Sequence, residues 1–382
     1  MALHADLVIP AADAETLREV ASWDGFRPAT LAPSDFPVDI VRFAGSSSRP
    51  VVLSRARRAE SLKALPASLR SGAEAAFERA ARRPAGLKLA HGRSLDLSSG
   101  PAVMGVVNVT PDSFSDGGVH FDRDRAVQAA LSMFEQGAAI VDVGGESTRP
   151  STYGAARELP ADEEIGRVVP VIAGIRERSQ GPLSIDTRKA AVARAAIDAG
   201  ADLVNDVTAG GFDPAMLPAI AETRAGAILM HMKGTDPRTM QSDLDYAHPL
   251  GDIAAFLAEA AGRAIAAGVG ADAIAIDPGL GFGKSPEHNL LLLRHLAALR
   301  AVGLPIAIGA SRKAFVRRFS GVAEDSGPAD RLPGSLAALA AAADGGAAIL
   351  RVHDVAESVR FLRLFRAIAG AVAPAPAGAI VP

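Results

Sequence analysis

Eight short apolar runs, separated by alanine-rich amphipathic stretches, most constrain the fold of this sequence. Arg123–Gln136, Lys189–Ala199 and Ile253–Ala267 are typical of the helical stretches, and each ends at a glycine suited to a left-handed C-cap. Eight strand-helix units over about 270 residues predict an α/β fold, a (β/α)8 TIM barrel. A doubly wound open sheet is the alternative, although it does not normally need eight similar units. The apolar runs are Val103–Val107, Ala139–Val143, Leu183–Ile185, Leu203–Asn205, Ala227–Met230, Ala273–Ile276, Ile306–Ile308 and Ala347–Val352.

Residues 1–98 show a different pattern, which predicts an additional N-terminal α/β segment. Glu15–Ala21 and Ala59–Arg82 have helical patterns, whereas Val38–Phe43 and Val51–Leu53 are typical of strands. No chemical motif is present in this region. We therefore expect an N-terminal accessory domain of unknown role at 1–98 and the barrel domain at 99–382.

Charge and composition narrow the classes of partner. The 40 basic and 43 acidic residues give a net charge of −3, which argues against nucleic-acid binding and requires local groups to hold any anionic substrate. The sequence has no cysteine, so it has neither disulfides nor thiolate metal sites. Apolar stretches such as Leu336–Ala343 are far shorter than the ~20 residues of a membrane span. Because no signal peptide is evident in Met1–Pro10, we expect a cytoplasmic protein acting on small molecules, with no nucleic-acid or membrane partner.

Polar residues follow each of the eight runs. In a parallel barrel the carboxyl ends of the strands meet at one rim and form the active site. An isolated aspartate before a helix is more often a cap, but polar clusters after eight successive strands favour a shared site. The clusters are Asn108, Asp142 with Glu146–Arg149, Asp186, Asn205-Asp206, Met230–Lys233, Asp277–Gly279, Ser311–Lys313 and Arg351–His353.

The residue types at these ends suggest a flat heterocycle as one ligand. Asp186, Asn205 and Asp277 suit a ring with several N–H donors, because a carboxylate can accept two parallel N–H bonds. Met230 and Phe282 can hold an aromatic ring between them.

A second group of residues favours an anion beside that ring. Lys313 can bond a ring carbonyl or ring nitrogen, and Asn108, Arg351 and His353 supply donors for a phosphate. A zinc site is not expected from the histidines, because none has the spacing of metal ligands. Mg²⁺ held by Asn108 and substrate phosphates is the metal that this pattern favours.

Two loops and one glycine-rich run complete the candidate features. Thr110–Phe121 and Glu146–Pro160 are long, polar and glycine-containing, so we expect them to close over a substrate. Gly279–Ser285 ends in Gly-Lys-Ser, but a Walker loop would need glycine where Pro278 stands, so we reject that interpretation.

Together these motifs resemble dihydropteroate synthase over about residues 100–372. The resemblance implies condensation of 7,8-dihydropterin-6-ylmethyl diphosphate with 4-aminobenzoate to 7,8-dihydropteroate and diphosphate, in folate biosynthesis. It also implies an SN1-like order, in which the bond to diphosphate breaks before the arylamine attacks. The motifs are Gly105–Gly118, Asp142–Pro150, Ser184–Thr187, Asn205–Val207, Met230–Gly234, Asp277–Lys284, Gly309–Lys313 and Arg351–Val355.

Residue roles follow from the same resemblance. Those implied to be catalytic are Asn108, Asp142, Arg149, Lys313, Arg351 and His353. Asp142 would support the first loop. The pterin site would contain Asp186, Asn205, Met230, Asp277, Phe282 and Lys313. The 4-aminobenzoate pocket would contain Thr148, Arg149, Pro150, Phe282 and Ser311. Asn108, Arg351 and His353 would hold the diphosphate, with Mg²⁺ at Asn108.

The sequence departs from the family pattern at two places. Position 151 is serine where glycine is usual, and the stretch up to Asp162 is a few residues longer than typical, which bears on 4-aminobenzoate and sulfonamide affinity. The N-terminal region is absent from the common short form. Two alternatives stay open: a pterin-binding homologue without synthase activity and a methyltetrahydrofolate-dependent methyltransferase. The resemblance also implies a homodimer.

Overall fold

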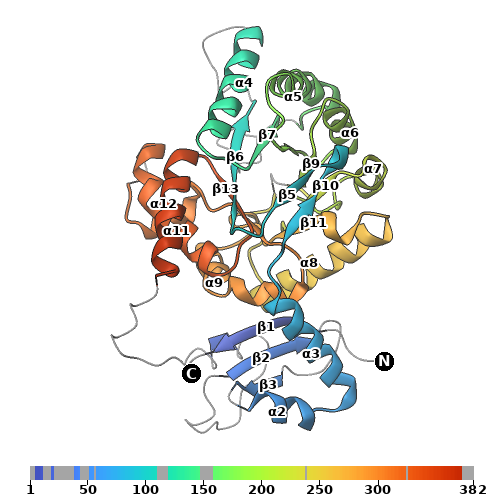
Figure 1. Ribbon diagram of the computed structural model, residues 1–382, viewed down its shortest axis with the longest axis vertical. Coiled ribbons are helices and arrows are strands. Elements are labelled where there is room, and N and C mark those ends of the chain that lie inside the picture. Colours follow the sequence, from blue (N-terminus) through green and yellow to red (C-terminus); the bar gives the residue numbers. More distant parts are fainter. Residues whose placement is uncertain are drawn as a thin grey trace, which may run out of the picture.

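The computed structural model contains a closed parallel barrel with a small sheet packed against it (Figure 1). It describes residues 5–11, 19–20, 38–43, 51–55, 57–109, 119–146, 158–236, 239–323 and 326–371. The barrel strands are β6 (Ala102–Asn108), β7 (Ile140–Gly144), β8 (Leu183–Asp186), β9 (Leu203–Asp206), β10 (Gly226–Met230), β11 (Ile274–Asp277), β12 (Ala307–Ile308) and β13 (Ile349–Val352).

The eight strands form one sheet in the order β11-β10-β9-β8-β7-β6-β13-β12, and every pairing in it is parallel. An isolated parallel bridge between Ile276 and Ile306 joins its two ends. This closure confirms the predicted TIM barrel and excludes the open sheet.

Helices cover the outside of the barrel. Gly137, Gly200 and Gly268 follow α4, α6 and α8 with φ of 100°, 112° and 100°, so the predicted left-handed caps are confirmed. The helices are α4 (Val119–Glu135), α5 (Ala161–Arg176), α6 (Ala190–Asp198), α7 (Met216–Thr223), α8 (Pro249–Ala266), α9 (Pro286–Arg294), α10 (Ala314–Phe319), α11 (Leu332–Asp344) and α12 (Val355–Ala369), with the 3-10 segment η5 (Leu296–Val302) after α9. Within the described residues, no helix is long and apolar enough to cross a membrane.

The N-terminal region forms an antiparallel sheet of β1 (Ala5–Ala11), β2 (Val38–Phe43) and β3 (Val51–Ser54), in that order. Both strands predicted here are confirmed. The helix predicted over Ala59–Arg82 is instead two helices, α2 (Arg58–Ala64) and α3 (Ala67–Ala81). Leu65 between them is extended because it precedes Pro66. The predicted helix Glu15–Ala21 lies mostly outside the described residues.

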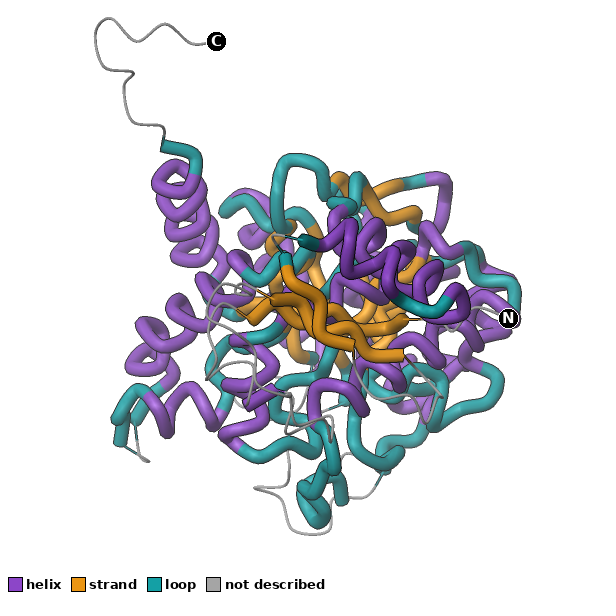
Figure 2. The backbone as a smooth tube through the Cα atoms, turned by 90° about the horizontal axis from the view of Figure 1, so that it is seen from below, coloured by secondary structure: helices purple, strands orange, loops and turns teal. Residues whose placement is uncertain are grey.

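The small sheet lies against one side of the barrel, and Figure 2 shows its strands across the molecule as seen from that side. Arg42 of β2 donates to the Gly251 carbonyl of α8 at 2.6 Å, and Arg79 of α3 donates to the Ala301 carbonyl of η5 at 2.6 Å. Ile9 and Ile40 join the buried core formed by the barrel and its helices. The two parts therefore share an apolar interface.

A hairpin of β4 (Gly86–Lys88) and β5 (Ser94–Asp96) covers the amino-terminal end of the barrel. Its buried Leu87 and Leu95 pack with residues inside the barrel such as Met104 and Ile349. The sequence analysis assigned this hairpin to residues 1–98, but its side chains belong to the barrel core.

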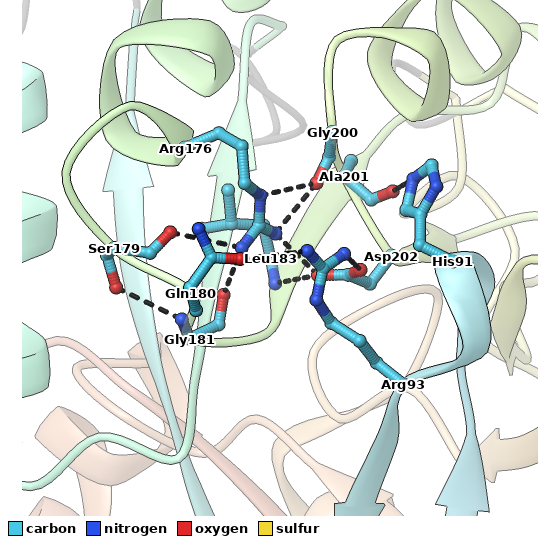
Figure 3. A network of polar contacts seen from close by, with 10 residues as sticks. All are labelled: His91, Arg93, Arg176, Ser179, Gln180, Gly181, Leu183, Gly200, Ala201 and Asp202. Atoms are coloured by element: carbon cyan, nitrogen blue, oxygen red, sulfur yellow. Dashed lines mark hydrogen bonds and ion pairs between the residues drawn. The ribbon is translucent and has the colours of Figure 1, made fainter.

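Asp202, at the start of β9, fastens the hairpin to the barrel (Figure 3). The Asp202 carboxylate is fully buried and accepts from Arg93 at 2.7 Å, Arg176 at 2.7 Å and the Leu183 amide at 2.8 Å. The hairpin supplies Arg93, whereas α5 supplies Arg176. One carboxylate thus joins three elements at the end of the barrel opposite the predicted site.

We expect Asp202→Asn to lower the free energy of unfolding by about 3 kcal/mol, because it leaves two guanidinium groups without their buried counter-charge. Thermal denaturation monitored by circular dichroism would measure the change. Asp272→Asn is the control, since Asp272 pairs with Lys88 while 57% of its side chain is exposed, and such pairs contribute little. Equal unfolding temperatures for Asp202→Asn and the parent would contradict the prediction.

Candidate active site

Four predicted residues meet at the carboxyl ends of β7, β8, β9 and β13. The Arg351 guanidinium donates from Nε to Asp142 Oδ2 and from Nη2 to Asp186 Oδ2, both at 2.7 Å. Asn205 Nδ2 donates to the same Asp142 oxygen at 3.1 Å. The strand order brings them together, because β13 lies beside β6 and thus near β7 and β8. The result is a polar cluster inside the mouth of the barrel.

One oxygen of this cluster lacks a partner. Asp142 is fully buried, and its Oδ1 has no hydrogen-bond partner within the described parts of the chain. A buried acceptor without a bond is costly, so a donor from a ligand would be favoured there. The resemblance implied that Asp142 supports the first loop. Residues 110–118 of that loop, predicted as Thr110–Phe121, lie outside the described residues, and the last three begin α4. The role of Asp142 therefore stays a prediction.

Burial changes the acidity of two carboxyls in the mouth. It raises the pKa of Asp186 to about 7, against the pull of Arg351 and with help from Asp142. It also raises the pKa of Asp277 to about 6, while the Gly279 amide and the Lys313 ammonium act in the opposite direction. Carboxyls perturbed in this way gather at functional sites more often than elsewhere.

An apolar cluster lies beside Asp277, which pairs with Met230 across β10 and β11. Phe282 packs against a cluster that contains Met230, Met232 and Met240. The Lys313 Nζ lies 4.1 Å from the centre of the Phe282 ring and donates to the Leu280 carbonyl at 2.8 Å. The structure thus places Met230, Phe282 and Lys313 together, as the sequence analysis predicted.

The loops after β12 and β13 meet at another part of the rim. The Ser311 hydroxyl accepts from the His353 amide at 3.2 Å and lies 3.1 Å from its ring Nδ1. Arg312, at a left-handed φ of 60°, pairs with Asp354 through Nε at 3.0 Å and also through Nη2. A non-glycine residue in this region is strained, and strained residues are common at functional sites. This ion pair joins the residue after Ser311 to the residue after His353, so it fixes the positions of Ser311 and His353 relative to each other.

Asn108 ends β6 next to these groups. A side chain at Gly144 would come within 3.8 Å of both Asn108 Oδ1 and Asp186 Oδ2, so the two oxygens face the same glycine. Gly144 thus brings the ends of β6 and β8 toward one point at the carboxyl ends of the strands, where a ligand would bind.

The amino-acid sequence of this chain is similar to those of known enzymes. A family described as "Pterin binding enzyme" matches residues 104–353, which is more than half of the chain. The dihydropteroate synthase of Escherichia coli K12 is 44% identical over 278 residues, which is 73% of this chain and 95% of that protein. The chain belongs to the dihydropteroate synthase family. The Mycobacterium leprae dihydropteroate synthase is 46% identical over 265 residues, covering 69% of this chain and 91% of that protein.

Solved dihydropteroate synthases have the same barrel. The Xanthomonas albilineans enzyme with 4-aminobenzoic acid has a TM-score of 0.68 and 42% identity, over 75% of this chain and 100% of that one. The same enzyme in complex with 7,8-dihydropteroate has a TM-score of 0.66 and 40% identity over the same shares. About a quarter of this chain therefore lies outside the part shared with these dihydropteroate synthases.

Some predicted site residues cannot be placed. Thr148, Arg149 and Pro150 lie outside the described residues, as does Ser151. The residues on either side of this segment are described, and they form a network of ion pairs that the sequence analysis missed. Lys189 Nζ donates to Glu146 Oε2 at 2.7 Å and to the fully buried Glu164 Oε2 at 2.6 Å. It therefore joins the end of β7 to α5. The adjacent acidic and basic residues resembled ordinary helix ends, so no sequence signal identified this bridge.

Proposed function

We propose that this chain condenses 7,8-dihydropterin-6-ylmethyl diphosphate with 4-aminobenzoate, giving 7,8-dihydropteroate and diphosphate in folate biosynthesis. The observation that carries the proposal is the Arg351 cluster with Asp142 and Asp186, placed beside the slot formed by Phe282 and Lys313. A donor-rich heterocycle and an anion fit this arrangement. The ligands of two solved relatives, 4-aminobenzoic acid and 7,8-dihydropteroate, agree with it.

The pterin ring would bind among Asp142, Asp186, Asn205 and Asp277. Asp142 Oδ1 is buried without a bond in the described structure, so an N–H of the ring would satisfy it. Ionised carboxylates accept the N–H donors of the aminopyrimidine edge. Lys313 would donate to the ring carbonyl or a ring nitrogen, and Met230 with Phe282 would pack on the ring faces.

The diphosphate would bind to Asn108, Arg351 and His353. The Asn108 amide oxygen faces Gly144 at the carboxyl end of the barrel, and an oxygen ligand shared with phosphates suits Mg²⁺. Within the described residues no group of three acidic or histidine side chains could hold a metal alone, so substrate phosphates would supply the remaining ligands. When bound, Mg²⁺ neutralises negative charge on the diphosphate.

We propose that the C–O bond to diphosphate breaks first. Its electron pair leaves with diphosphate, and Arg351 and His353 stabilise the added charge. The pterin cation that remains is stabilised by the carboxylates around it, which lie in a site of low dielectric. The nitrogen of 4-aminobenzoate then forms the C–N bond and loses a proton. This amine is a free nucleophile, so the step needs no dedicated general base.

The second substrate would enter a pocket of Thr148, Arg149, Pro150, Phe282 and Ser311. Two contacts support this assignment. Phe282 lies against Lys313 of the proposed pterin site, and Ser311 lies against His353 of the proposed diphosphate site. The Lys189 bridge holds both sides of the segment that carries the other three residues. Ser151, in place of the usual glycine, would affect affinity for 4-aminobenzoate and sulfonamides.

A coupled assay of diphosphate release tests the proposal. We expect release only when pterin diphosphate and 4-aminobenzoate are both present, with 7,8-dihydropteroate formed in equal amount. Pterin binding without release dependent on 4-aminobenzoate would instead support a pterin-binding homologue that has no synthase activity. Demethylation of methyltetrahydrofolate would support the methyltransferase.

We expect kcat/KM for pterin diphosphate to fall as pH decreases from 7 to 5. The raised pKa values of Asp186, about 7, and of Asp277, about 6, place their protonation in this range. The ionised carboxylates accept the N–H bonds of the ring, so protonation removes binding. Steady-state rates over pH 5 to 9 would measure the effect. In Asp277→Asn the decrease near pH 6 should disappear while the decrease near pH 7, which belongs to Asp186, remains. A parent profile that is flat down to pH 5 would refute this assignment.

A homodimer and a cytoplasmic location also belong to the proposal. Leu364 and Ile368 on α12 have 63% and 66% of their surface exposed, and a second copy of the chain could cover this apolar face. Sedimentation velocity would measure the mass in solution, and a dimer that Leu364→Lys disrupts would support this interface.

A further inference from the structure

Lys284 has no role in the proposed reaction, although it is one of the most buried charged residues of the barrel. Only 3% of it is exposed. Its Nζ lies 2.8 Å from His231 Nδ1, 3.2 Å from the His231 carbonyl and 3.0 Å from the Phe282 carbonyl. It thus links the segment that follows β10 to the segment that follows β11.

The link does not depend on the protonation state of the amine. An ammonium has three N–H donors, and a neutral amine has two donors for the carbonyls and a lone pair for the ring nitrogen. Burial, with help from Lys284, lowers the pKa of His231 to about 2, so its ring is neutral. Nδ1 of a neutral ring can either accept or donate a hydrogen bond, depending on the tautomer. Both carbonyls are therefore held in either case.

The backbone around Lys284 is shaped for close contact between the two segments. Gly279 has φ of 68°, and a Cβ there would lie 2.0 Å from the His231 carbonyl oxygen. Gly283 has φ of 65°, and a Cβ there would lie 2.5 Å from Lys233 Cβ. Only glycine suits both the conformation and the space. The run Gly279–Ser285, which superficially resembles a Walker loop, thus serves close packing of two segments.

The two carbonyls that Lys284 bonds, those of His231 and Phe282, lie next to residues of the proposed pterin site. Phe282 carries one of them and forms one wall, and His231 directly follows Met230, which belongs to the same apolar cluster. We propose that Lys284 is a positioning residue that fixes the separation of the two segments carrying Met230 and Phe282, and thereby the affinity for the pterin ring. This inference rests on the proposed function and deepens it.

Lys284→Met tests the inference, because methionine keeps the length of the side chain but has no N–H donor. We expect KM for pterin diphosphate to rise about tenfold, which corresponds to loss of one buried hydrogen bond, with kcat changed by less than about threefold. The dissociation constant of a non-reacting pterin, measured by calorimetry, should rise by the same factor. A purely structural role would lower the amount of active enzyme and leave KM unchanged.

Two variants act as controls. Asp202→Asn removes a buried charge at the opposite end of the barrel, and we expect a lower unfolding temperature with an unchanged KM. Lys284→Gln keeps an N–H donor, so its rise in KM should be smaller than that of Lys284→Met. Where Lys284→Met does not fold, Lys284→Gln decides: a pterin dissociation constant equal to that of the parent overturns the inference, and an increase supports it.

Failure of the inference can be distinguished from failure of the proposed function. If the parent protein releases no diphosphate but binds pterin, the synthase proposal fails while the calorimetric comparison still tests Lys284. If the parent is active and Lys284→Met has the parental KM and pterin affinity, the synthase proposal stands and the role of Lys284 is refuted.

Discussion

Replacing Arg351 with methionine is expected to lower kcat/KM about 10³-fold, as removal of a group that stabilises developing charge typically does. Arg351 lies between two carboxylates at 2.7 Å and faces the space where the leaving group would lie. Burial opposes its charge, yet Asp142 and Asp186 raise the pKa of Arg351 above its ordinary value, so it is cationic at any working pH. In the described parts of the chain, Arg351 is the side chain that bonds both Asp142 and Asp186.

The same substitution should also destabilise the fold. It leaves Asp142, which is fully buried, and Asp186 without their counter-charge, and loss of one partner of such a pair costs about 3 kcal/mol. Arg351→Lys keeps the charge but cannot bond both carboxylates in the same fork, so an intermediate activity is expected. Arg318→Met, with 61% of the side chain exposed, is the control for loss of a positive charge. An active Arg351→Met enzyme would remove Arg351 from the proposed mechanism.

Lys313→Ala is expected to lower kcat/KM by about two orders of magnitude, because it removes the proposed charged contact to the pterin ring. The Lys313 ammonium lies over the Phe282 ring and bonds the Leu280 carbonyl, which holds it at the edge of the slot. The Lys313 side chain also lies close to Gly281, where a Cβ would be 3.2 Å from Lys313 Cδ.

Calorimetry would show which substrate the Lys313→Ala enzyme has lost. The expected result is weaker binding of pterin and unchanged unfolding temperature, since the lysine is only half-buried. Lys88→Ala, at the other end of the barrel with 71% of its side chain exposed, should match the parent in both assays. Full activity of Lys313→Ala would refute the role given to this residue.

Most of the barrel could be predicted from the sequence because its signals are local. Alternation of short apolar runs with amphipathic helices marked all eight strands to within two residues, and glycines marked helix ends. The candidate site residues were predicted for a related reason. In a parallel barrel every strand ends at the same rim, so position in the sequence already indicates position in the site.

Contacts between distant segments could not be predicted in this way. The hairpin β4–β5 seemed part of the N-terminal region, but its leucines fill the barrel end. Nothing near Lys284 indicated that it would bond His231, 53 residues earlier in the chain. The break between α2 and α3 at Leu65 could have been predicted, because a residue before proline disfavours the helical conformation and Pro66 follows it.

The sequence by itself determined the fold class, the family resemblance and the set of polar residues at the strand ends, because periodicity, caps and motifs are properties of neighbouring residues. Only the tertiary structure decided how those residues pair. Parallel pairing of β13 with β6, in a sheet whose two ends meet at Ile276 and Ile306, places Arg351 between Asp142 and Asp186. The pairing, the burial and the raised pKa values depend on the packing of segments up to 209 residues apart, and such distances leave no local pattern in a sequence.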